Sequence, residues 1–551
     1  MNFSFLGSKQ HLRIPLLLLA LAGLSQIEPV KGQSPASPNV AASTPNALHL
    51  PAIIGDHMVL QQKQADPIWG WDVPGTRVTV EFAGQSKTAI AGDNGKWIVK
   101  LDPLPSNASP QVMRITGSCK KEIQDVLVGE VWVCSGQSNM GYRLRDSWNG
   151  DMEAAATHNS ELRLITVPAD RGTQVLLDDF SGSWSQASPF SSSMFSAVGL
   201  LYGRYLQQVL QVPVGMINNA WGGSTVDAWI RRAVLDKEAR FQARMQQAAK
   251  REAELLPDNG KEENDRELAK WQVACDKAKA EHKPLPFGPP LHWLQSQKRP
   301  GNAFASLLYP ILGYGIRGVI WYQGESDGNR PWDYPALFPF MIQQWRSEWN
   351  QGNFPFYWFQ LPKYDNGQRA APFQGAWAEI REAQTKALSL PNTGQAVLID
   401  QGETSNIHPH KKAEVAARMA RVALTKDYGF KLPYRSPEFN SIAISGNKAT
   451  ITFDCFGSRL YLYDSPKVLG FAICGTNQKW EPAQASLANG NTVEVWNDTV
   501  SAPVAVRYAW QNAPECNLFS KEGLPATPFR TDSFPLSTPE PQPSPNPHPE
   551  H

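Results

Sequence analysis

The chain has 551 residues, of which 42% are hydrophobic and 10% aromatic, and its formal net charge is +1. This composition excludes a largely disordered protein, and the length predicts about three or four domains. The balanced charge gives no reason to expect nucleic acid or an anionic membrane surface as a partner.

Residues 1–32 are typical of a signal peptide. Basic side chains within residues 9–13 precede an apolar run over 14–24 that is too short to span a bilayer. Small residues at 30–32 suit a signal peptidase, so we expect cleavage near Gln33; an uncleaved anchor is the alternative. The sequence therefore predicts a secreted or periplasmic protein without stable membrane insertion after cleavage.

A linker rich in Pro, Ser, Ala and Asn follows at 33–47. From 48 to 124, short β-type runs such as 76–82 and 96–101 are separated by turn dipeptides that contain glycine. Short strands at this spacing predict a small N-terminal β-sandwich-like domain.

Between 125 and 432 the pattern changes to apolar strands that alternate with helices. Helical patterns cover 197–210 and 411–424, among others. The expected strands are 125–133, 212–218, 314–322, 354–361 and 395–400. Continuous apolar strands between helices predict a parallel sheet covered on both faces, with the ligand site beyond the carboxyl ends of the strands.

Two further regions complete the organisation. A charged stretch at 236–284 predicts a helical hairpin inserted into the α/β domain, either a solvated excursion or a lid over the site. Residues 433–535 return to strands and turns and predict a C-terminal β-domain, and 536–551 are expected to be a disordered tail.

The six cysteines form neither a CxxC pair nor a Cys/His cluster with zinc spacing. No metal or other cofactor is implied. Cys455 and Cys474 lie in one predicted domain and could pair, but disulfide pairing and oligomeric state stay open.

The first loop that carries a candidate catalytic residue contains Gly136-Gln137-Ser138-Asn139-Met140 and follows the strand that ends at 133. A serine hydroxyl is a weak nucleophile and must be presented at an exposed turn beside a base. The preceding glycine allows the sharp turn. The pattern differs from the nucleophile elbow of α/β-hydrolases, which has glycine where this chain has Met140.

The second loop contains Trp221-Gly222-Gly223-Ser224, directly after another expected strand. Glycine amides carry no side chain, so they can point into a site and stabilise an oxyanion. The loop is therefore a candidate source of hydrogen-bond donors.

The third loop contains Gln323-Gly324-Glu325-Ser326 and follows the strand over 314–322. The side-chain amide of Gln323 can donate a further hydrogen bond to an oxyanion. Glu325 either orders the loop or holds a substrate hydroxyl.

The fourth loop follows Asp400 and contains Asn406-Ile407-His408-Pro409. Histidine is the obvious general base because its ordinary pKa lies near neutrality. His408 lies at an expected strand end before a strong helical pattern, and it is our candidate base.

Together these motifs resemble the sialate O-acetylesterase family, which belongs to the wider SGNH hydrolases. The shared motifs are Gly-Gln-Ser-Asn-Met, Trp-Gly-Gly-Ser, Gln-Gly-Glu-Ser and Ile-His-Pro, at 136–140, 221–224, 323–326 and 407–409. Flanking phrases at 58–62, 126–132, 506–510, 523–525 and 528–532 are also similar. The resemblance therefore runs from about 48 to 532, excluding the helical insertion.

The resemblance implies an SGNH-type α/β fold and a carboxylic ester hydrolase that removes acetyl groups from a carbohydrate. Ser138 would attack the acetyl carbonyl, and His408 would take its proton and later activate water. The amide of Ser138, a glycine amide (preferably that of Gly223) and the side chain of Gln323 would form the oxyanion hole. Further residues are candidates for substrate binding or support; these are Gln137, Asn139, Trp221, Gly222, Glu325 and Asp400.

One position departs from the SGNH pattern. These enzymes commonly carry an aspartate three residues before the histidine, and this chain has Ser405 there. Either a main-chain carbonyl orients His408, or the carboxylate of Asp400, Glu403 or Glu325 does so. Our interpretation is a Ser–His dyad supported by the backbone.

The sugar remains open at this point. Sialic acid is the name-giving substrate of the family, and acetylated xylan or another polysaccharide is the alternative. Pocket loops around Trp221, Asp227, Trp229 or the insertion would select it, and a few of the 19 tryptophans could serve as stacking platforms for sugar rings. The alternative of another class is a catalytically inactive, glycan-binding protein.

Overall fold

The computed structural model describes residues 47–170, 172–283, 288–365, 373–463 and 465–538. The expected signal peptide, nearly all of the expected linker and most of the expected tail lie outside these residues. Within the described ranges, none of the helices combines the length and apolar character needed to cross a membrane.

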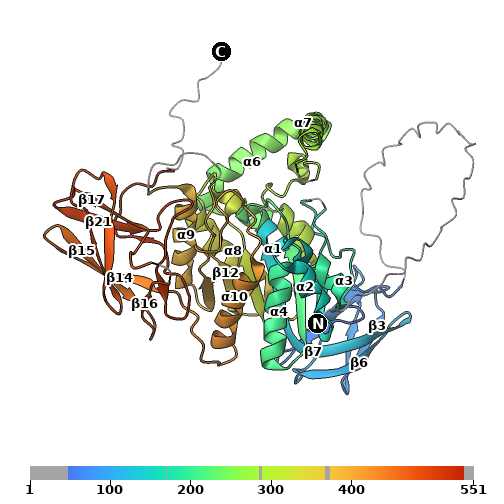
Figure 1. Ribbon diagram of the computed structural model, residues 1–551. Helices are drawn as coiled ribbons and strands as arrows, with labels where there is room; N and C mark the ends of the chain where they lie inside the picture. Colours follow the sequence, from blue (N-terminus) through green and yellow to red (C-terminus); the bar gives the residue numbers. More distant parts are fainter. Residues whose placement is uncertain (1–46, 171, 284–287, 366–372, 464, 539–551) are drawn as a thin grey trace, which may run out of the picture. The chain divides into compact units, whose positions relative to one another are not determined.

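The α/β region is built on a largely parallel sheet that includes β7 and β12 (Figure 1). Its strand order is β13-β12-β11-β7-β10-β8-β9. All neighbours in it are parallel except β8 and β9. The strands are β7 (Lys120–Gly136), β8 (Asn159–Thr166), β9 (Ser185–Ala187), β10 (Val214–Ala220), β11 (Gly318–Tyr322), β12 (Phe356–Phe359) and β13 (Thr393–Ala396). The predicted α/β class is confirmed.

Alternation along the strands explains why both faces of this sheet are covered. On β7, Val131 and Val133 join the core beneath helices α8 (Tyr334–Trp349) and α9 (Ala376–Lys386). Trp132 and Cys134 point the other way and join the core beneath α4 (Ala197–Leu210) and α10 (Lys412–Lys426). Side chains alternate across a strand, so a continuous apolar run supplies two cores at once.

Short helices occupy the connections of the α/β region. They are α1 (Ser138–Gly141), α2 (Gly150–Ala155), α3 (Pro189–Met194) and α5 (Arg232–Leu235). The expected helix at 197–210 coincides with α4, and the one expected at 411–424 corresponds to α10.

Strand β7 also belongs to the N-terminal β-region, where it pairs with β1 and β6. The boundary expected between 124 and 125 falls inside this strand, at Asp125, whose φ is +56°. The Asp125 carboxylate accepts a hydrogen bond from Arg163 at 2.9 Å and lies 2.6 Å from His57 Nδ1. The remaining strands are β1 (Val59–Gln61), β2 (Pro67–Trp71), β3 (Arg77–Phe82), β4 (Gln85–Ile90), β5 (Lys96–Lys100) and β6 (Asn107–Thr116).

The C-terminal region is built from two four-stranded antiparallel sheets, β14-β15-β20-β19 and β18-β17-β21-β23, and a short pair, β16-β22. The strands are β14 (Glu438–Ser445), β15 (Lys448–Asp454), β16 (Leu460–Tyr461), β17 (Phe471–Gly475), β18 (Trp480–Pro482), β19 (Gln484–Asn489), β20 (Thr492–Trp496), β21 (Pro503–Tyr508), β22 (Phe519–Ser520) and β23 (Phe529–Arg530).

One observed strand lies a few residues before its predicted position. The sequence favoured a strand over 395–400, but β13 covers Thr393–Ala396. The apolar residues Val397 and Ile399 are buried because they pack into the core of the C-terminal region instead.

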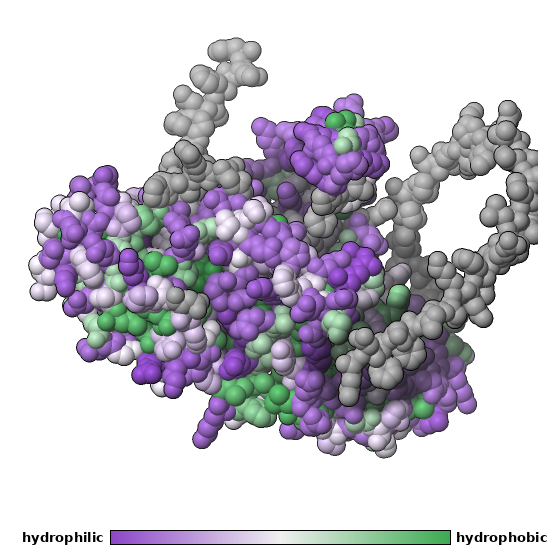
Figure 2. Space-filling view, viewed as in Figure 1, coloured by the Kyte–Doolittle hydropathy of each residue, from purple (hydrophilic) through white to green (hydrophobic). Residues whose placement is uncertain are grey.

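The insertion is a helical hairpin of α6 (Gln242–Leu255) and α7 (Lys261–Ala280). Cys275 is the only buried residue of α7, and Figure 2 shows the visible surface of the hairpin's end as predominantly hydrophilic. All six cysteines lie in the described residues and none forms a disulfide, so Cys455 and Cys474 are not paired.

Candidate active site

The loop after β7 presents Ser138 at the carboxyl edge of the sheet. Gly136 adopts φ +131°, and a Cβ there would lie 2.2 Å from the Tyr322 carbonyl oxygen, so the tight passage beside β11 requires glycine. The amide of Gln137 then donates to that carbonyl oxygen at 2.9 Å. Among residues 131–140, Ser138 alone is not buried. The fold therefore leaves a single reachable side chain in an otherwise buried turn.

Ser138 lies against His408. The Nε2 atom of His408 is 2.7 Å from the Oγ atom of Ser138, across 270 residues of chain. The His408 amide donates to the Oδ1 atom of Asn406 at 3.0 Å, and its ring packs on Tyr142 with centroids 5.9 Å apart. Nucleophile and base candidates are thus within direct proton-transfer distance.

Burial lowers the pKa of His408 from its ordinary value to about 4, and the positive charges of Lys412 and His410 contribute. A neutral imidazole can accept a proton, whereas an imidazolium cannot. His408 is therefore in the proton-accepting form at neutral and mildly acidic pH.

The three carboxylates considered for orienting His408 each have another partner. Asp400 forms a bidentate pair with Arg418 at 2.6 and 2.7 Å. Glu403 accepts hydrogen bonds from the amide of His410 at 2.7 Å and from Asn406 Nδ2 at 3.2 Å, which shapes the loop.

The third carboxylate, Glu325, belongs to a buried bridge beneath the nucleophile turn. Asn139 donates through Nδ2 to the Oε1 atom of Glu325 at 2.5 Å and to the carbonyl of Ile407 at 2.9 Å. Its Oδ1 atom accepts from the Nζ atom of Lys412 at 2.6 Å. One amide therefore joins the first, third and fourth loops.

The two charged groups of this bridge have pKa values shifted toward their neutral forms. Burial lowers the pKa of Lys412 to about 7 and raises that of Glu325. The ammonium of Lys412 also lies over the rings of Tyr142 and Tyr322, at 4.9 and 5.5 Å from their centroids. Sequence reasoning missed Lys412, although its position at the start of a helix four residues after His408 was visible.

The glycines of the second loop lie beside Ser138. A Cβ on Gly222 would be 3.4 Å from the Cβ of Ser138. Gly223 has φ +75°, and a Cβ there would be 2.9 Å from the side-chain nitrogen of Gln297, a residue that the sequence had not indicated. Trp221 is 5% exposed, and its amide donates to the carbonyl of Gly136 at 2.9 Å, so it supports the turn.

Gln323 is fully buried and braces the second loop. Its Nε2 group donates to the Ser224 carbonyl at 3.1 Å and to Asp327 at 2.6 Å. Both amide hydrogens are therefore engaged in this structure, and an oxyanion would have to replace one of these acceptors. Gln137 joins the first loop to the third, because its Oε1 atom accepts a hydrogen bond from the amide of Ser326 at 3.2 Å.

The insertion is tied to the second loop through a buried arginine. Arg244 of α6 is 7% exposed and donates to Asp227 at 2.7 Å and to Asp333 at 2.6 Å. Asp227 and Trp229, which the sequence placed among candidate pocket residues, are 1% and 0% exposed and support the loop from within.

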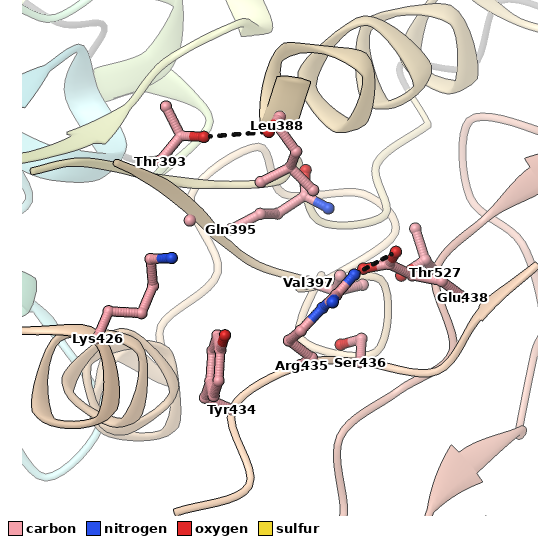
Figure 3. A pocket seen from close by; sticks show the side chains of 11 residues that line it. Leu388, Thr393, Gln395, Val397, Lys426, Tyr434, Arg435, Ser436, Glu438 and Thr527 are labelled. Atoms are coloured by element: carbon pink, nitrogen blue, oxygen red, sulfur yellow. Dashed lines mark hydrogen bonds and ion pairs between the residues drawn. The ribbon is translucent and has the colours of Figure 1, made fainter. Parts of the chain in front are cut away.

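A separate cavity of about 210 Å³ lies between β13, α10 and the start of the C-terminal region. Lys426, Tyr434 and Arg435 border it, and Arg435 pairs with Glu438 at 2.9 Å (Figure 3). None of its lining residues belongs to the four loops, so it is distinct from the Ser138 site.

Known proteins resemble this chain in both sequence and structure. Residues 293–425 match the family described as carbohydrate esterase, sialic acid-specific acetylesterase. The structure of a carbohydrate acetylesterase from Xanthomonas citri is similar with a TM-score of 0.75 and 32% identity, over 89% of this chain and all of that one. The chain belongs to the sialate O-acetylesterase family.

Mammalian members of this family are also similar along most of their length. Mouse sialate O-acetylesterase is 29% identical over 525 residues, which cover 86% of this chain and 93% of that protein. The human enzyme is 27% identical over 523 residues, which cover 86% of this chain and 91% of that protein. As a member of the sialate O-acetylesterase family, the chain is a carboxylic ester hydrolase, and its relatives support carbohydrate acetylesterase activity.

Proposed function

We propose that this protein is an exported carbohydrate O-acetylesterase with Ser138 as nucleophile and His408 as general base. The 2.7 Å contact between His408 Nε2 and Ser138 Oγ carries the proposal, because it joins a reachable hydroxyl to a neutral imidazole. Export rests on the signal-peptide pattern of residues 1–32.

In the acylation step, Ser138 Oγ attacks the acetyl carbonyl carbon while His408 takes the hydroxyl proton. The tetrahedral intermediate collapses, the bond to the sugar oxygen breaks, and His408 returns the proton to that oxygen. A water molecule, deprotonated by His408, then attacks the acetyl-serine. The bond between the acetyl carbon and Ser138 Oγ breaks, His408 returns the proton to Oγ, and acetate leaves. No cofactor is needed for this sequence.

The oxyanion would be held by the amides of Ser138 and of one glycine of the second loop, with Gly223 preferred. Each such donor contributes about 3–4 kcal/mol in the transition state. Gln323 can become a third donor if the oxyanion replaces Ser224 O or Asp327 as its acceptor. The four-loop bracing through Asn139 and Gln323 would keep these donors preorganised.

The substrate is proposed to be an acetylated sugar, and relatives named sialate O-acetylesterase and carbohydrate acetylesterase favour this class. Sialic acid and acetylated polysaccharides such as xylan are the two options within it. An inactive glycan-binding protein is disfavoured by the Ser138–His408 contact.

The decisive experiment measures p-nitrophenyl acetate hydrolysis by the wild type and by Ser138→Ala, with circular dichroism as the check on folding. We expect kcat to fall at least about 10³-fold in the variant, since a nucleophile is lost. Equal activity in both proteins would refute Ser138 as nucleophile. Absence of activity in both would favour the glycan-binding alternative.

A further inference from the structure

One tryptophan differs from all others in its exposure. All 19 tryptophans lie within the described residues, and 18 of them are buried or partly buried. Trp148 is 63% exposed. Exposure of one indole does not by itself make a site, but it presents a large, flat apolar surface to solvent.

Trp148 is attached to the segment that carries His408. Its amide donates to the carbonyl of His410 at 3.0 Å, two residues beyond His408. Because a chain advances at most about 3.5 Å per residue, the two backbones lie within about 10 Å of each other. Adjoining rings of an oligosaccharide can span that distance.

The turn that presents this indole is tightly built. Ser147 donates through Oγ to the Leu144 carbonyl at 2.7 Å, and the amide of Gly150 donates to the Ser147 carbonyl at 3.1 Å. A Cβ on Gly150 would lie 1.7 Å from the Leu144 oxygen, so no larger residue fits there. The ammonium of Lys411 lies 5.7 Å from the ring centroid of Trp148. These contacts fix the backbone and limit the swing of the ring, which reduces the entropy lost on binding.

We infer that Trp148 is a stacking platform for a sugar ring next to the ring that carries the scissile acetyl group. The apolar C–H face of a pyranose matches the flat indole surface, and the exposed polar residues Arg145 and Asn149 flank Trp148 in the sequence. The inference rests on the proposed esterase function. It names the substrate class as an acetylated oligosaccharide or longer glycan in preference to an isolated monosaccharide.

The test compares a small and a large substrate in the full-length protein. We would measure kcat and KM for p-nitrophenyl acetate, for 9-O-acetylated sialyllactose and for O-acetylated xylo-oligosaccharides of increasing length. For Trp148→Ala we expect KM for the glycan that the wild type hydrolyses to rise about three- to tenfold, with p-nitrophenyl acetate changed less than about twofold. Trp148→Phe should recover part of the loss, because it keeps an aromatic surface.

The matched control is Phe190→Ala, which removes another exposed aromatic side chain, 80% exposed on α3. It should leave both substrates unchanged. Equal losses in the two variants would overturn the assignment to Trp148. Equal loss on the small and large substrates would also overturn it, because Trp148 would then act only through the His408 segment.

Binding provides a second readout. In a Ser138→Ala background, the glycan should change the intrinsic fluorescence, and the additional Trp148→Phe substitution should remove that change. If the glycan changes the fluorescence of neither protein, the assignment of Trp148 as a platform is refuted. Failure of the proposed function is distinguishable, because a wild type inactive on p-nitrophenyl acetate would contradict the esterase itself. A wild type that hydrolyses p-nitrophenyl acetate but none of the acetylated glycans would overturn the platform and the proposed sugar substrate together. Glycan hydrolysis with a KM that Trp148→Ala leaves unchanged would refute the platform alone.

Discussion

The Nζ atom of Lys412 donates to the Oδ1 atom of Asn139 at 2.6 Å, directly behind Ser138. Lys412 begins the helix α10 after the His408 loop, whereas Asn139 lies in the turn after β7. The contact fixes the nucleophile turn to the base loop, and it also places a positive charge near His408. Lys412 therefore both positions the Ser138 turn and lowers the pKa of His408.

Lys412→Met should move the acidic limb of the pH–activity profile to higher pH. In acid, Lys412 is protonated and its charge lowers the pKa of His408, so removing it lets that pKa rise. Burial also lowers this pKa and remains, so the apparent value should stay below the ordinary 6.5. The measurement is kcat/KM for p-nitrophenyl acetate between about pH 4 and 8.

A purely structural role for Lys412 would lower activity without moving this limb. Lys411→Met is the control, because that ammonium lies over Trp148 rather than beneath the nucleophile turn. It should leave the limb in place.

Asn139→Ala should lower kcat more than it raises KM for p-nitrophenyl acetate. The substitution leaves the Lys412 ammonium and the Glu325 carboxylate without their common partner in a buried site. We expect kcat to fall about 10- to 100-fold because the turn that positions Ser138 loosens. A change in KM alone would contradict this assignment.

Asp400→Asn should reduce stability far more than chemistry. Asp400 pairs with Arg418, whose side chain is 4% exposed, and breaking a buried pair costs about 3–5 kcal/mol. Urea unfolding should show this loss, while the folded fraction keeps kcat within about tenfold of the wild type. His408→Ala, in contrast, should lose at least about 10³-fold in kcat. Comparable losses in the two folded variants would assign Asp400 to the catalytic machinery and refute the dyad.

Arg244→Met should destabilise the protein by about 3–5 kcal/mol, because the buried carboxylate of Asp227 loses its cation. The matched control is Arg251→Met on the same helix. The Arg251 side chain pairs with Glu263 but is 48% exposed, so the loss in unfolding free energy should stay below about 1 kcal/mol. Equal unfolding free energies for the two variants would show that the insertion is held by other contacts.

Much of the fold could be read from local pattern. Continuous apolar runs between helical patterns predicted the α/β class, and the period of 197–210 located α4 at its observed bounds. The displaced strand at 395–400 shows the limit of this reasoning. Val397 and Ile399 are apolar because they pack against the C-terminal region, and sequence hydrophobicity does not reveal which neighbour buries a side chain.

The site divides in the same way. Ser138, His408, the two glycines and Gln323 could be nominated because short loops at strand ends carry recognisable residue types. Lys412, Arg244 and Trp148 were not nominated, since a lysine or arginine on a helical pattern and one tryptophan among 19 look ordinary in sequence.

By itself, then, the sequence determined the fold class, the order of the strand-end loops and which side chains could do chemistry. Only the tertiary structure decided which of them meet. It placed Ser138 against His408 across 270 residues, engaged Asp400 with Arg418, and committed the amide of Gln323 to Ser224 and Asp327. The physical reason is that hydrogen bonds and burial depend on distances between elements remote in the chain, whereas residue type and periodicity are local.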